Sequence, residues 1–258
     1  MSAGRLDGRH VVVTGAGTGI GQAIARRLAS EGARLSILAR DVSRLESTAQ
    51  ELGDVVRVFP CDIREREAVD AAFALLAQAH GPIFGLVANS GIGGPNEPGP
   101  QDRFDDLVAT NLTGTYLCFR AAQRHLLEPA TGTRHLIAVS SILARIGVPG
   151  YTGYCASKAG ILGLARALAA ELAPSDVQVN ALCPGWVDTA MAHEGIAGMA
   201  SAMGVSEKAA LGIAMTQVPL GRMSQPEDVA GMVAWLLSAD ARGVTGQALD
   251  MNGGAFMS

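Results

Sequence analysis

Short apolar runs alternate along the chain with longer stretches in which apolar residues recur every three or four positions. The runs are rich in Val, Ile and Leu and are bounded by Gly, Pro or polar residues, which is typical of buried strands, and the longer stretches have the period of amphipathic helices. This alternation predicts an α/β fold around a parallel sheet. The expected strands cover His10–Thr14, Arg34–Ala39, Val55–Phe59, Phe84–Ala88, Leu136–Ser140, Val177–Leu182 and Gln247–Met251. The main expected helices cover Gln22–Glu31, Arg64–Gln78, Phe104–Leu127, Tyr151–Leu172 and Asp228–Ser238.

Two stretches depart from this regular pattern. The helix expected over 104–127 contains Asn111-Leu-Thr-Gly114, and because Asn and Gly are poor residues for a helix interior, we expect a local break there. Residues 189–217 hold scattered Ala, Gly and Met in short helical patches, and we interpret them as a movable cover over a substrate. Met191, Met199, Met203 and Met215 would line an adaptable apolar pocket or pack within the cover. We expect one domain over residues 1–258, with the cover at about 189–217.

A glycine-rich turn follows the first strand. Gly15, Gly19 and Gly21 lie between that strand and the next helix. This arrangement brings backbone N–H groups and the positive end of a helix dipole to one point, where a pyrophosphate fits without meeting side chains. The sequence therefore predicts a dinucleotide site.

The end of the second strand bears on the choice of dinucleotide. In such folds an acidic residue here holds the ribose 2′-hydroxyl of NAD, whereas an Arg accommodates the 2′-phosphate of NADP. The chain has Ala39 and Arg40 at this point, which favours NADP(H) over NAD(H). A solvated surface charge at Arg40 is the alternative.

Tyr154 and Lys158 are four residues apart and so share one face of the expected helix. A cation beside a phenol lowers the phenol pKa, which suits the phenol to general acid–base catalysis. Ser141 lies just upstream and is able to donate a hydrogen bond to the same substrate oxygen. The common alternative is that Tyr154 and Lys158 are an exposed pair on a helix with no catalytic role. The glycine turn earlier in the chain favours the catalytic interpretation.

Composition narrows the class of partner. The 258 residues are 48% hydrophobic and carry a net charge of −4, and no basic stripe is evident, so we expect no nucleic-acid partner. No apolar run approaches the roughly 20 residues of a membrane span, and the start is short and polar, so we expect no membrane contact and a cytoplasmic location. The four cysteines Cys61, Cys118, Cys155 and Cys183 lack metal-ligand spacing, so we expect small buried residues and no metal.

The glycine turn, together with Ser141, Tyr154 and Lys158 in that order, resembles the short-chain dehydrogenase/reductase family. The Ala39-Arg40 step and the stretch from Val218 to Asp228 are similar in pattern to polyketide and 3-oxoacyl-acyl-carrier-protein ketoreductases. This resemblance implies a Rossmann-type, doubly wound sheet of seven parallel strands in the order 3-2-1-4-5-6-7, with helices on both faces. It also implies a homotetramer in which helices 104–127 and 151–172 form one interface.

The resemblance also assigns roles to individual positions. It implies catalytic roles for Asn111, Ser141, Tyr154 and Lys158, with Asn111 holding a water that links Lys158 to solvent. It implies cofactor contacts from Gly15, Thr18, Gly19, Ile20, Gly21, Arg40, Asp62, Ile63, Asn89, Gly91, Tyr154, Lys158, Pro184, Gly185, Val187 and Thr189. The pocket candidates are Ile92, Ile142, Leu143, Trp186 and Met191. One departure is that the family's Asn-Asn-Ala-Gly reads Ala88-Asn-Ser-Gly91 here, so the first amide is missing.

These positions together predict hydride transfer between NADP(H) and a ketone or secondary alcohol. The pocket candidates imply a small-molecule substrate that is largely apolar, of 3-oxoacyl or polyketide type. Arg145 is expected to face solvent, with contact to an acidic group as the alternative. An NAD-dependent, catabolic secondary-alcohol dehydrogenase is a second hypothesis. A non-catalytic, cofactor-binding regulator is a third, although a regulator has no chemical need for all four candidate catalytic residues.

Overall fold

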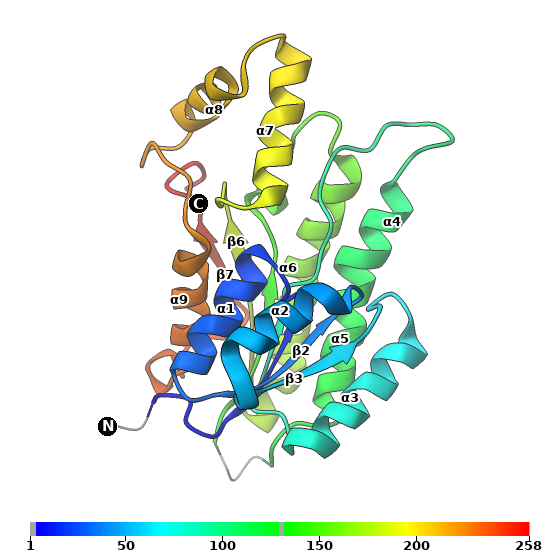
Figure 1. Ribbon diagram of the computed structural model, residues 1–258, viewed down its shortest axis with the longest axis vertical. Coiled ribbons are helices and arrows are strands. Elements are labelled where there is room, and N and C mark those ends of the chain that lie inside the picture. The colour runs from blue at the N-terminus through cyan, green and yellow to red at the C-terminus, as the bar shows by residue number, and fades with distance from the viewer. Residues whose placement is uncertain (1–3, 129–131, 258) are drawn as a thin grey trace.

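Seven parallel strands run through the centre of the protein in the order β3-β2-β1-β4-β5-β6-β7. The computed structural model describes residues 4–128 and 132–257 (Figure 1). The order and the parallel pairing confirm the predicted fold. The strands are β1 (His10–Thr14), β2 (Arg34–Ala39), β3 (Val56–Pro60), β4 (Gly85–Ala88), β5 (Arg134–Val139), β6 (Val177–Pro184) and β7 (Ala248–Met251).

The central strands are buried along their whole length. Every residue of β1, β4, β5 and β6 is buried, as expected for parallel strands covered on both faces. The strand order reverses between β1 and β4. A crevice forms at such a reversal beyond the carboxyl ends of the strands, and ligands of open α/β sheets bind there.

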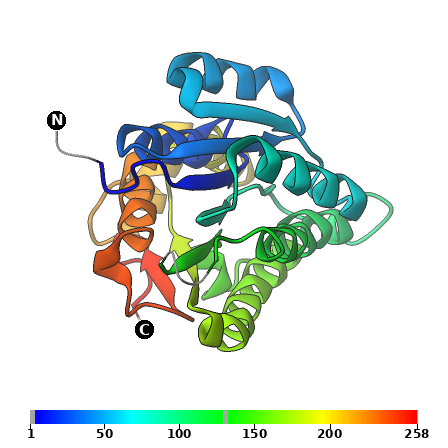
Figure 2. The ribbon, with the colours of Figure 1, turned by 90° about the horizontal axis from the view of Figure 1, so that it is seen from below.

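Helices form a layer on each face of the sheet, as the view from below shows (Figure 2). One apolar core joins the sheet to α1, α2 and α9, and a second core joins the other face to α3, α5 and α6. Burial of these apolar faces is the main stabilising contribution to the fold. The helices are α1 (Gly19–Ser30), α2 (Val42–Leu52), α3 (Arg66–His80), α4 (Phe104–Val108), α5 (Gly114–Gln123), α6 (Thr152–Leu172) and α9 (Pro226–Leu236).

The predicted break in the helix over 104–127 is confirmed. A π-helical turn, Ala109–Thr113, separates α4 from α5. Gly114 follows it because a Cβ there would lie 2.6 Å from the Cδ1 of Ile63, so the two segments approach too closely for a side chain. The wider turn carries Asn111 fully into the interior, with 0% of the residue exposed.

Two further helices, α7 (Ala190–Met203) and α8 (Glu207–Thr216), lie beyond the carboxyl ends of the strands (Figure 1). We call them the α7–α8 segment. They share a small apolar cluster built around Ile196 and Ala210, separate from the two large cores. Met199 and Met215 pack against this cluster, while Met191 and Met203 are about half exposed. Across the described residues, no helix combines the length and apolar character needed to cross a bilayer.

Three buried histidines make the fold acid-sensitive: His80, whose pKa burial lowers, and, with larger shifts, His10 and His135. His10 is 1% exposed, with its ring nitrogens 2.8 Å from the Gly81 carbonyl oxygen and 2.8 Å from Ser36 Oγ, and His135 is 4% exposed. Burial lowers the pKa of His10 and that of His135 from 6.5 to about 4. The unfolded chain therefore binds protons first as pH falls, so stability is complete above pH 6.5 and is lost towards pH 4.

We expect urea unfolding at pH 7.5 and pH 5 to differ by about 2 kcal/mol for each of His10 and His135. In His10→Asn the difference should shrink by the contribution of that histidine. The same pH dependence in His10→Asn as in the wild type would contradict this assignment.

Candidate active site

The carboxyl end of β5 and the first turn of α6 bring Ser141 and Tyr154 together. Ser141 lies just beyond β5, and its Oγ accepts a hydrogen bond from the backbone N–H of Leu143 at 3.1 Å, which fixes the side chain. Tyr154 is the third residue of α6, and its hydroxyl is hydrogen-bonded to the Ser141 hydroxyl. Two hydroxyl groups therefore meet at the edge of the sheet where ligands of this fold bind.

The pKa of the Tyr154 phenol is raised, chiefly because the side chain is removed from water. The hydrogen bond from Ser141 acts in the opposite direction and is the weaker effect. The prediction that Lys158 lowers the phenol pKa is therefore wrong for the protein by itself. The partly buried hydroxyl of Tyr154 is a candidate proton donor.

Lys158 lies one helical turn after Tyr154, as predicted. Its Nζ donates a hydrogen bond to the carbonyl oxygen of Val139 at 3.0 Å and lies 5.6 Å from the centre of the Tyr154 ring. The ammonium thus faces the ring and the backbone, which is why it does not govern the phenol pKa. Burial lowers the pKa of Lys158 to about 8.

Asn111 connects the loop after β4 to helix α6. Its Oδ1 accepts from the N–H of Ile92 at 2.9 Å, and its Nδ2 donates to the Ile92 carbonyl at 3.0 Å and to Ser157 Oγ at 3.1 Å. Its own carbonyl oxygen accepts from Thr115 Oγ1 at 2.7 Å. The Asn111 side chain therefore holds the loop after β4 in a fixed position relative to α6.

The glycine turn is packed too closely to carry side chains at its glycines. Gly15 and Gly19 have φ of +67° and +53°, in the region that favours glycine. A Cβ on Gly21 would lie 2.1 Å from the Gly15 carbonyl oxygen and 2.5 Å from Asn89 Nδ2. Thr18 and Ile20 lie in the same turn at the start of α1. The positive φ angles and the close packing therefore explain why this turn is built from glycines.

Asn89 holds the turn from the neighbouring strand end. Its Nδ2 donates to the carbonyl oxygens of Thr14 and Gly15 at 3.2 and 3.1 Å, and Thr14 Oγ1 accepts from the N–H groups of Asn89 and Ser90. Gly91 lies further along, where a Cβ would come within 3.4 Å of Lys158 Nζ. The side-chain contacts that fix the turn thus come from Asn89. They form although the chain has Ala88 where the family pattern has a first Asn.

Arg40, at the end of β2, lies beside an acidic group. Its Nη1 is 3.9 Å from Asp62 Oδ2, and its side chain is 56% exposed. Asp62 is held more closely by Arg64, whose Nη2 donates to the same oxygen at 2.7 Å, and this hydrogen bond keeps the pKa of Asp62 below its usual range. Ile63, next along the chain, is buried against Gly114. The Arg40 guanidinium is therefore largely exposed and makes only a long contact with Asp62.

The segment after β6 brings four more predicted cofactor positions to the same edge. Gly185 packs against Asn252, Val187 is buried, and Thr189 caps α7 by accepting from the N–H of Ala192 at 3.3 Å. Thr189 Cγ2 is also 3.2 Å from where a Cβ of Gly19 would lie. Pro184 is the last residue of β6. The chain that follows it reaches Thr189, which lies next to the glycine turn and caps the first helix of the α7–α8 segment.

The five pocket candidates divide into two groups. Ile92, Leu143 and Met191 are partly exposed on the ligand side, and Met191 Sδ lies 2.9 Å from where a Cβ of Gly93 would be. Ile142 is buried, and Trp186 packs under the α7–α8 segment. The second group therefore shapes the site from beneath.

Arg145 does not face solvent, so that expectation is wrong. Its Nε lies 3.2 Å from Asp250 Oδ1, its Nη2 donates to the Ala248 carbonyl at 2.9 Å, and its guanidinium lies over the ring of Phe256. The side chain is 21% exposed. Arg145 thus ties the turn after Ser141 to β7.

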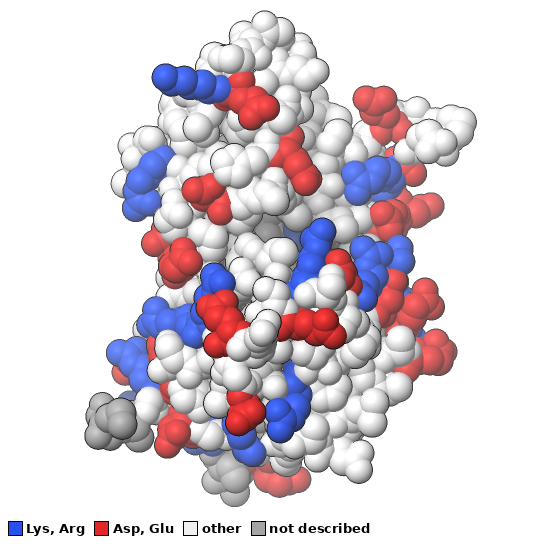
Figure 3. Space-filling model, viewed as in Figure 1, with Lys and Arg blue, Asp and Glu red and all other residues white. Residues whose placement is uncertain are grey.

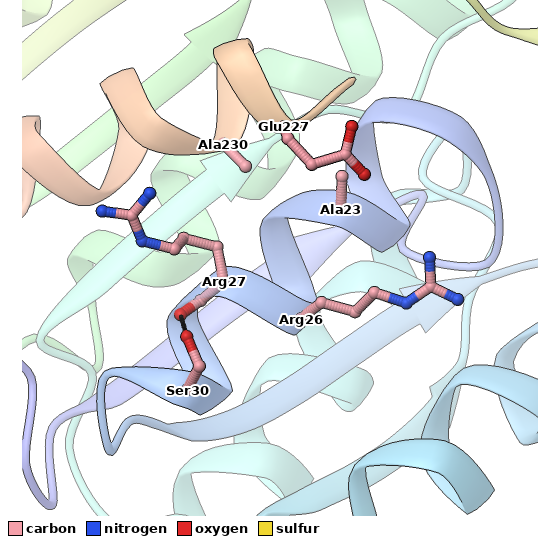
Figure 4. A pocket seen from close by; sticks show the side chains of 6 residues that line it. All are labelled: Ala23, Arg26, Arg27, Ser30, Glu227 and Ala230. Carbon is pink, nitrogen blue, oxygen red and sulfur yellow. Dashed lines mark hydrogen bonds between the residues drawn. The ribbon is translucent and has the colours of Figure 1, made fainter. Parts of the chain in front are cut away.

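Two surface cavities have linings that do not include Ser141 or Tyr154. One, of about 330 Å³, lies between α1 and α9 and is lined by Arg26, Arg27 and Glu227 among others (Figure 4). Both arginines there have acidic partners, Glu51 and Glu31, so this cavity offers no free cation to a ligand. The other, of about 380 Å³, lies near Asp250 and Phe256. Among the described residues, His, Cys, Asp and Glu side chains form no group able to hold a metal ion.

Comparison with known proteins identifies the family. The family model described as enoyl-(acyl carrier protein) reductase matches residues 15–255. A putative ketoacyl reductase of Streptomyces coelicolor is 37% identical over 255 residues, covering 96% of this chain and 97% of that protein. The chain belongs to the short-chain dehydrogenase/reductase family. It is accordingly an NAD(P)-dependent oxidoreductase that acts on CH–OH or C=O groups.

Other members of the short-chain dehydrogenase/reductase family show the range of its relatives. The 2-(S)-hydroxypropyl-CoM dehydrogenase 3 of Xanthobacter autotrophicus is 34% identical and covers 97% of each chain. The crystal structure of a single-substitution variant of the actinorhodin polyketide ketoreductase with NADPH superposes with a TM-score of 0.91 at 35% identity, covering 98% of each chain. The relatives thus include both reductases and a dehydrogenase.

Three residues of this short-chain dehydrogenase/reductase site were missed by sequence reasoning. Arg64 donates a hydrogen bond to the Asp62 carboxylate, and Arg103 donates one to the Gly93 carbonyl oxygen at 3.2 Å. Asn96 accepts a hydrogen bond from the backbone N–H of Gly153 at the start of α6. Arg64 directly follows the predicted Asp62-Ile63 pair, which was a usable signal. Asn96 lies in an irregular Gly/Pro loop, where neither period nor motif marks it.

Proposed function

We propose that the protein reduces a ketone to a secondary alcohol with NADP(H), with Tyr154 as the general acid. The observation that carries the proposal is the hydrogen-bonded pair of Ser141 and Tyr154 hydroxyls beside the glycine turn. Ser141 donates a hydrogen bond to the substrate oxygen, and Tyr154 gives that oxygen its proton.

The remaining candidate catalytic residues position and supply this acid. Lys158 holds a positive charge beneath the Tyr154 ring and binds the nicotinamide ribose. Asn111 fixes the loop at Ile92 and holds a water through which Lys158 exchanges protons with solvent. When bound, NADPH supplies the hydride. The cofactor is held by the glycine turn, by Asp62, Ile63, Asn89 and Gly91, and by the segment from Pro184 to Thr189.

The substrate that we propose is largely apolar, of 3-oxoacyl or polyketide type. The similarity to ketoacyl and polyketide ketoreductases supports this class. On the face shown in Figure 3, most of the surface over α7 and α8 is uncharged, which suits an apolar substrate. We further propose that the α7–α8 segment is the cover over this substrate, because Met191 contacts the loop at Gly93 and Thr189 contacts the glycine turn.

The test is turnover of the purified protein against a panel of β-keto thioesters and simple ketones, followed at the absorbance band of reduced nicotinamide. We expect NADPH oxidation with β-keto thioesters. Oxidation of secondary alcohols with NAD⁺, and no reduction of any ketone in the panel, would instead support an NAD-dependent, catabolic dehydrogenase.

Arg40→Ala tests the choice of cofactor. Because the guanidinium is proposed to bind the 2′-phosphate, the variant should lose about tenfold to a hundredfold in NADPH affinity, the effect of one charge-assisted contact. NADH affinity should stay unchanged. Fluorescence titration measures both. Wild-type protein that binds NADH as tightly as NADPH, with no change in Arg40→Ala, would contradict the assignment.

We also propose a homotetramer that uses the outer faces of α5 and α6. Small, exposed residues line one side of α6, namely Ala156, Ala159, Gly163, Ala167 and Ala170, and such a face allows close packing of helices from two copies. Light scattering during size-exclusion chromatography measures the mass directly.

A further inference from the structure

The helix that carries Tyr154 has no capping side chain of its own. Tyr151 occupies the N-cap position of α6 and makes no side-chain hydrogen bond to the first turn. The first backbone N–H groups of a helix lack partners within it, so a buried helix start needs acceptors from elsewhere. Asn96, 57 residues earlier in the chain, supplies one: its Oδ1 accepts from the N–H of Gly153 at 2.8 Å.

Every polar atom of the Asn96 side chain is used at this junction. The residue is 6% exposed. Its Nδ2 lies 3.0 Å from Thr152 Oγ1 and 3.1 Å from Asp102 Oδ1, and Thr152 Oγ1 lies 3.2 Å from Asn96 Oδ1. The backbone N–H of Asn96 donates to the Gly150 carbonyl at 2.8 Å. A buried side chain bonded on all sides has one position, and it transmits that position to its partners.

The junction also includes the helix that leads to Asn111. Asp102 Oδ1 accepts from the N–H of Phe104, the first residue of α4, at 2.9 Å. A Cβ on Gly153 would lie 3.1 Å from the Cα of Phe104, so α4 and α6 meet closely at this point. Asn96 and Asp102 therefore join the start of the helix that carries Tyr154 to the start of the helix that leads to Asn111.

The same side chain anchors the loop of residues 89–100. The loop has no regular helix or strand before residue 98. Asn111 holds it at Ile92, Arg103 holds it at Gly93, and Asn96 holds it at the start of α6. Because Ile92 is a pocket candidate, the loop wall and the Tyr154 hydroxyl are both set by the junction at Asn96.

We propose that Asn96 is a positioning residue for the Tyr154 acid. Its side chain caps α6 from the loop and thereby fixes the phenol relative to the loop that faces the substrate. The inference rests on the proposed function, since it takes Tyr154 as the proton donor. It adds a residue that acts through another and does not itself touch the reacting atoms.

Asn96→Ala is the first test. Removing the acceptor frees the first turn of α6, and displacement of a catalytic group by about 1 Å costs on the order of a hundredfold in rate, so we expect kcat to fall by about 10- to 100-fold. NADPH affinity should stay unchanged, because the glycine turn is untouched. Hydrogen exchange of the amides of residues 152–158 should become faster, and this measurement needs no substrate.

Asn180→Ala is the matched control. Asn180 is 2% exposed, its Nδ2 donates to the Val244 carbonyl at 2.8 Å and its Oδ1 accepts from the N–H of Gln247 at 3.0 Å. It is a buried, hydrogen-bonded asparagine in β6, and these bonds lead towards β7 and not to the start of α6. We expect a lower melting temperature with unchanged kcat. A merely structural Asn96 would behave in the same way.

An exchange of donor and acceptor provides the rescue. In Asn96→Asp alone, two carboxylates face each other across the 3.1 Å contact, and the donor to Asp102 is lost. In the double variant Asn96→Asp/Asp102→Asn, the new amide donates to the new carboxylate, which still accepts from Gly153 and Thr152. We expect kcat of the double variant to exceed that of Asn96→Asp by about tenfold.

The outcomes separate this inference from the proposed function. If Asn96→Ala lowers the melting temperature as Asn180→Ala does but leaves kcat and hydrogen exchange at residues 152–158 unchanged, the inference is overturned. If Asn96→Ala fails to fold, Thr152→Val removes two of the contacts and must slow turnover in the same direction, and unchanged kcat in that variant overturns the inference. Failure of the wild type to reduce any ketone contradicts the proposed function, while the exchange measurement still decides the role of Asn96 at the helix start.

Discussion

Tyr154→Phe is expected to lower kcat for ketone reduction by about 10²- to 10⁴-fold, the range that a positioned general acid contributes. The substitution removes the proton donor and its hydrogen bond to Ser141 but leaves an aromatic ring over Lys158. NADPH affinity should change by less than about threefold, because the hydroxyl that is lost makes at most a weak contact with the cofactor. Stopped-flow absorbance gives the rate, and fluorescence titration gives the affinity.

Tyr116→Phe is the control for this measurement. Tyr116 lies on α5, where its ring contacts the Arg120 guanidinium, so loss of its hydroxyl should leave turnover unchanged. Tyr154→Phe with wild-type turnover would remove the phenol from the mechanism. Unchanged biological function of Tyr154→Phe, in a protein that binds NADPH without turnover, would support the alternative of a regulator that only binds the cofactor.

Gly21→Ala has the second large expected effect, on both stability and cofactor binding. The added Cβ would lie 2.1 Å from the Gly15 carbonyl oxygen and 2.5 Å from Asn89 Nδ2, so the turn must open. Overpacking of this kind costs about 3 kcal/mol of unfolding free energy. Displacement of the backbone N–H groups should weaken NADPH binding by more than about a hundredfold. Urea unfolding and calorimetric titration measure the two effects.

Gly231→Ala serves as the matched substitution. Gly231 lies inside α9, the helix that packs on α1, and its Cβ would meet Arg27 Nη1 at 3.5 Å, an ordinary contact. We expect a gain of about 0.5–1 kcal/mol from the better helix propensity of Ala, with unchanged NADPH affinity. Gly21→Ala that binds NADPH as the wild type does would show that the glycine turn is not the pyrophosphate site.

Much of the fold was predictable because its signals are local. The apolar runs of β1 and β4 are buried at every position, so their composition alone marks them as central parallel strands. The break at Asn111 was visible because Asn and Gly oppose a helix interior, although the sequence does not say that the break is a π-helical turn. The strand order came from the family resemblance, since pairing between distant strands leaves no local pattern.

The errors at the site have a common physical origin. The pKa of Tyr154 depends on burial by residues far away in the chain, and spacing to Lys158 does not report burial. Arg145 pairs with Asp250, which lies 105 residues away, so its solvent exposure was not readable from its neighbours. Asn96 was missed for the same reason, because its partners are brought to it only by the crossing of α4 and α6.

The measurement that tests the central claim most directly is calorimetric titration of the purified protein with NADPH and with NADH. The account predicts one NADPH per chain, bound at least about tenfold more tightly than NADH, as expected for a guanidinium on the 2′-phosphate. Binding of neither dinucleotide would contradict the assignment of the glycine turn and, with it, the proposed reaction.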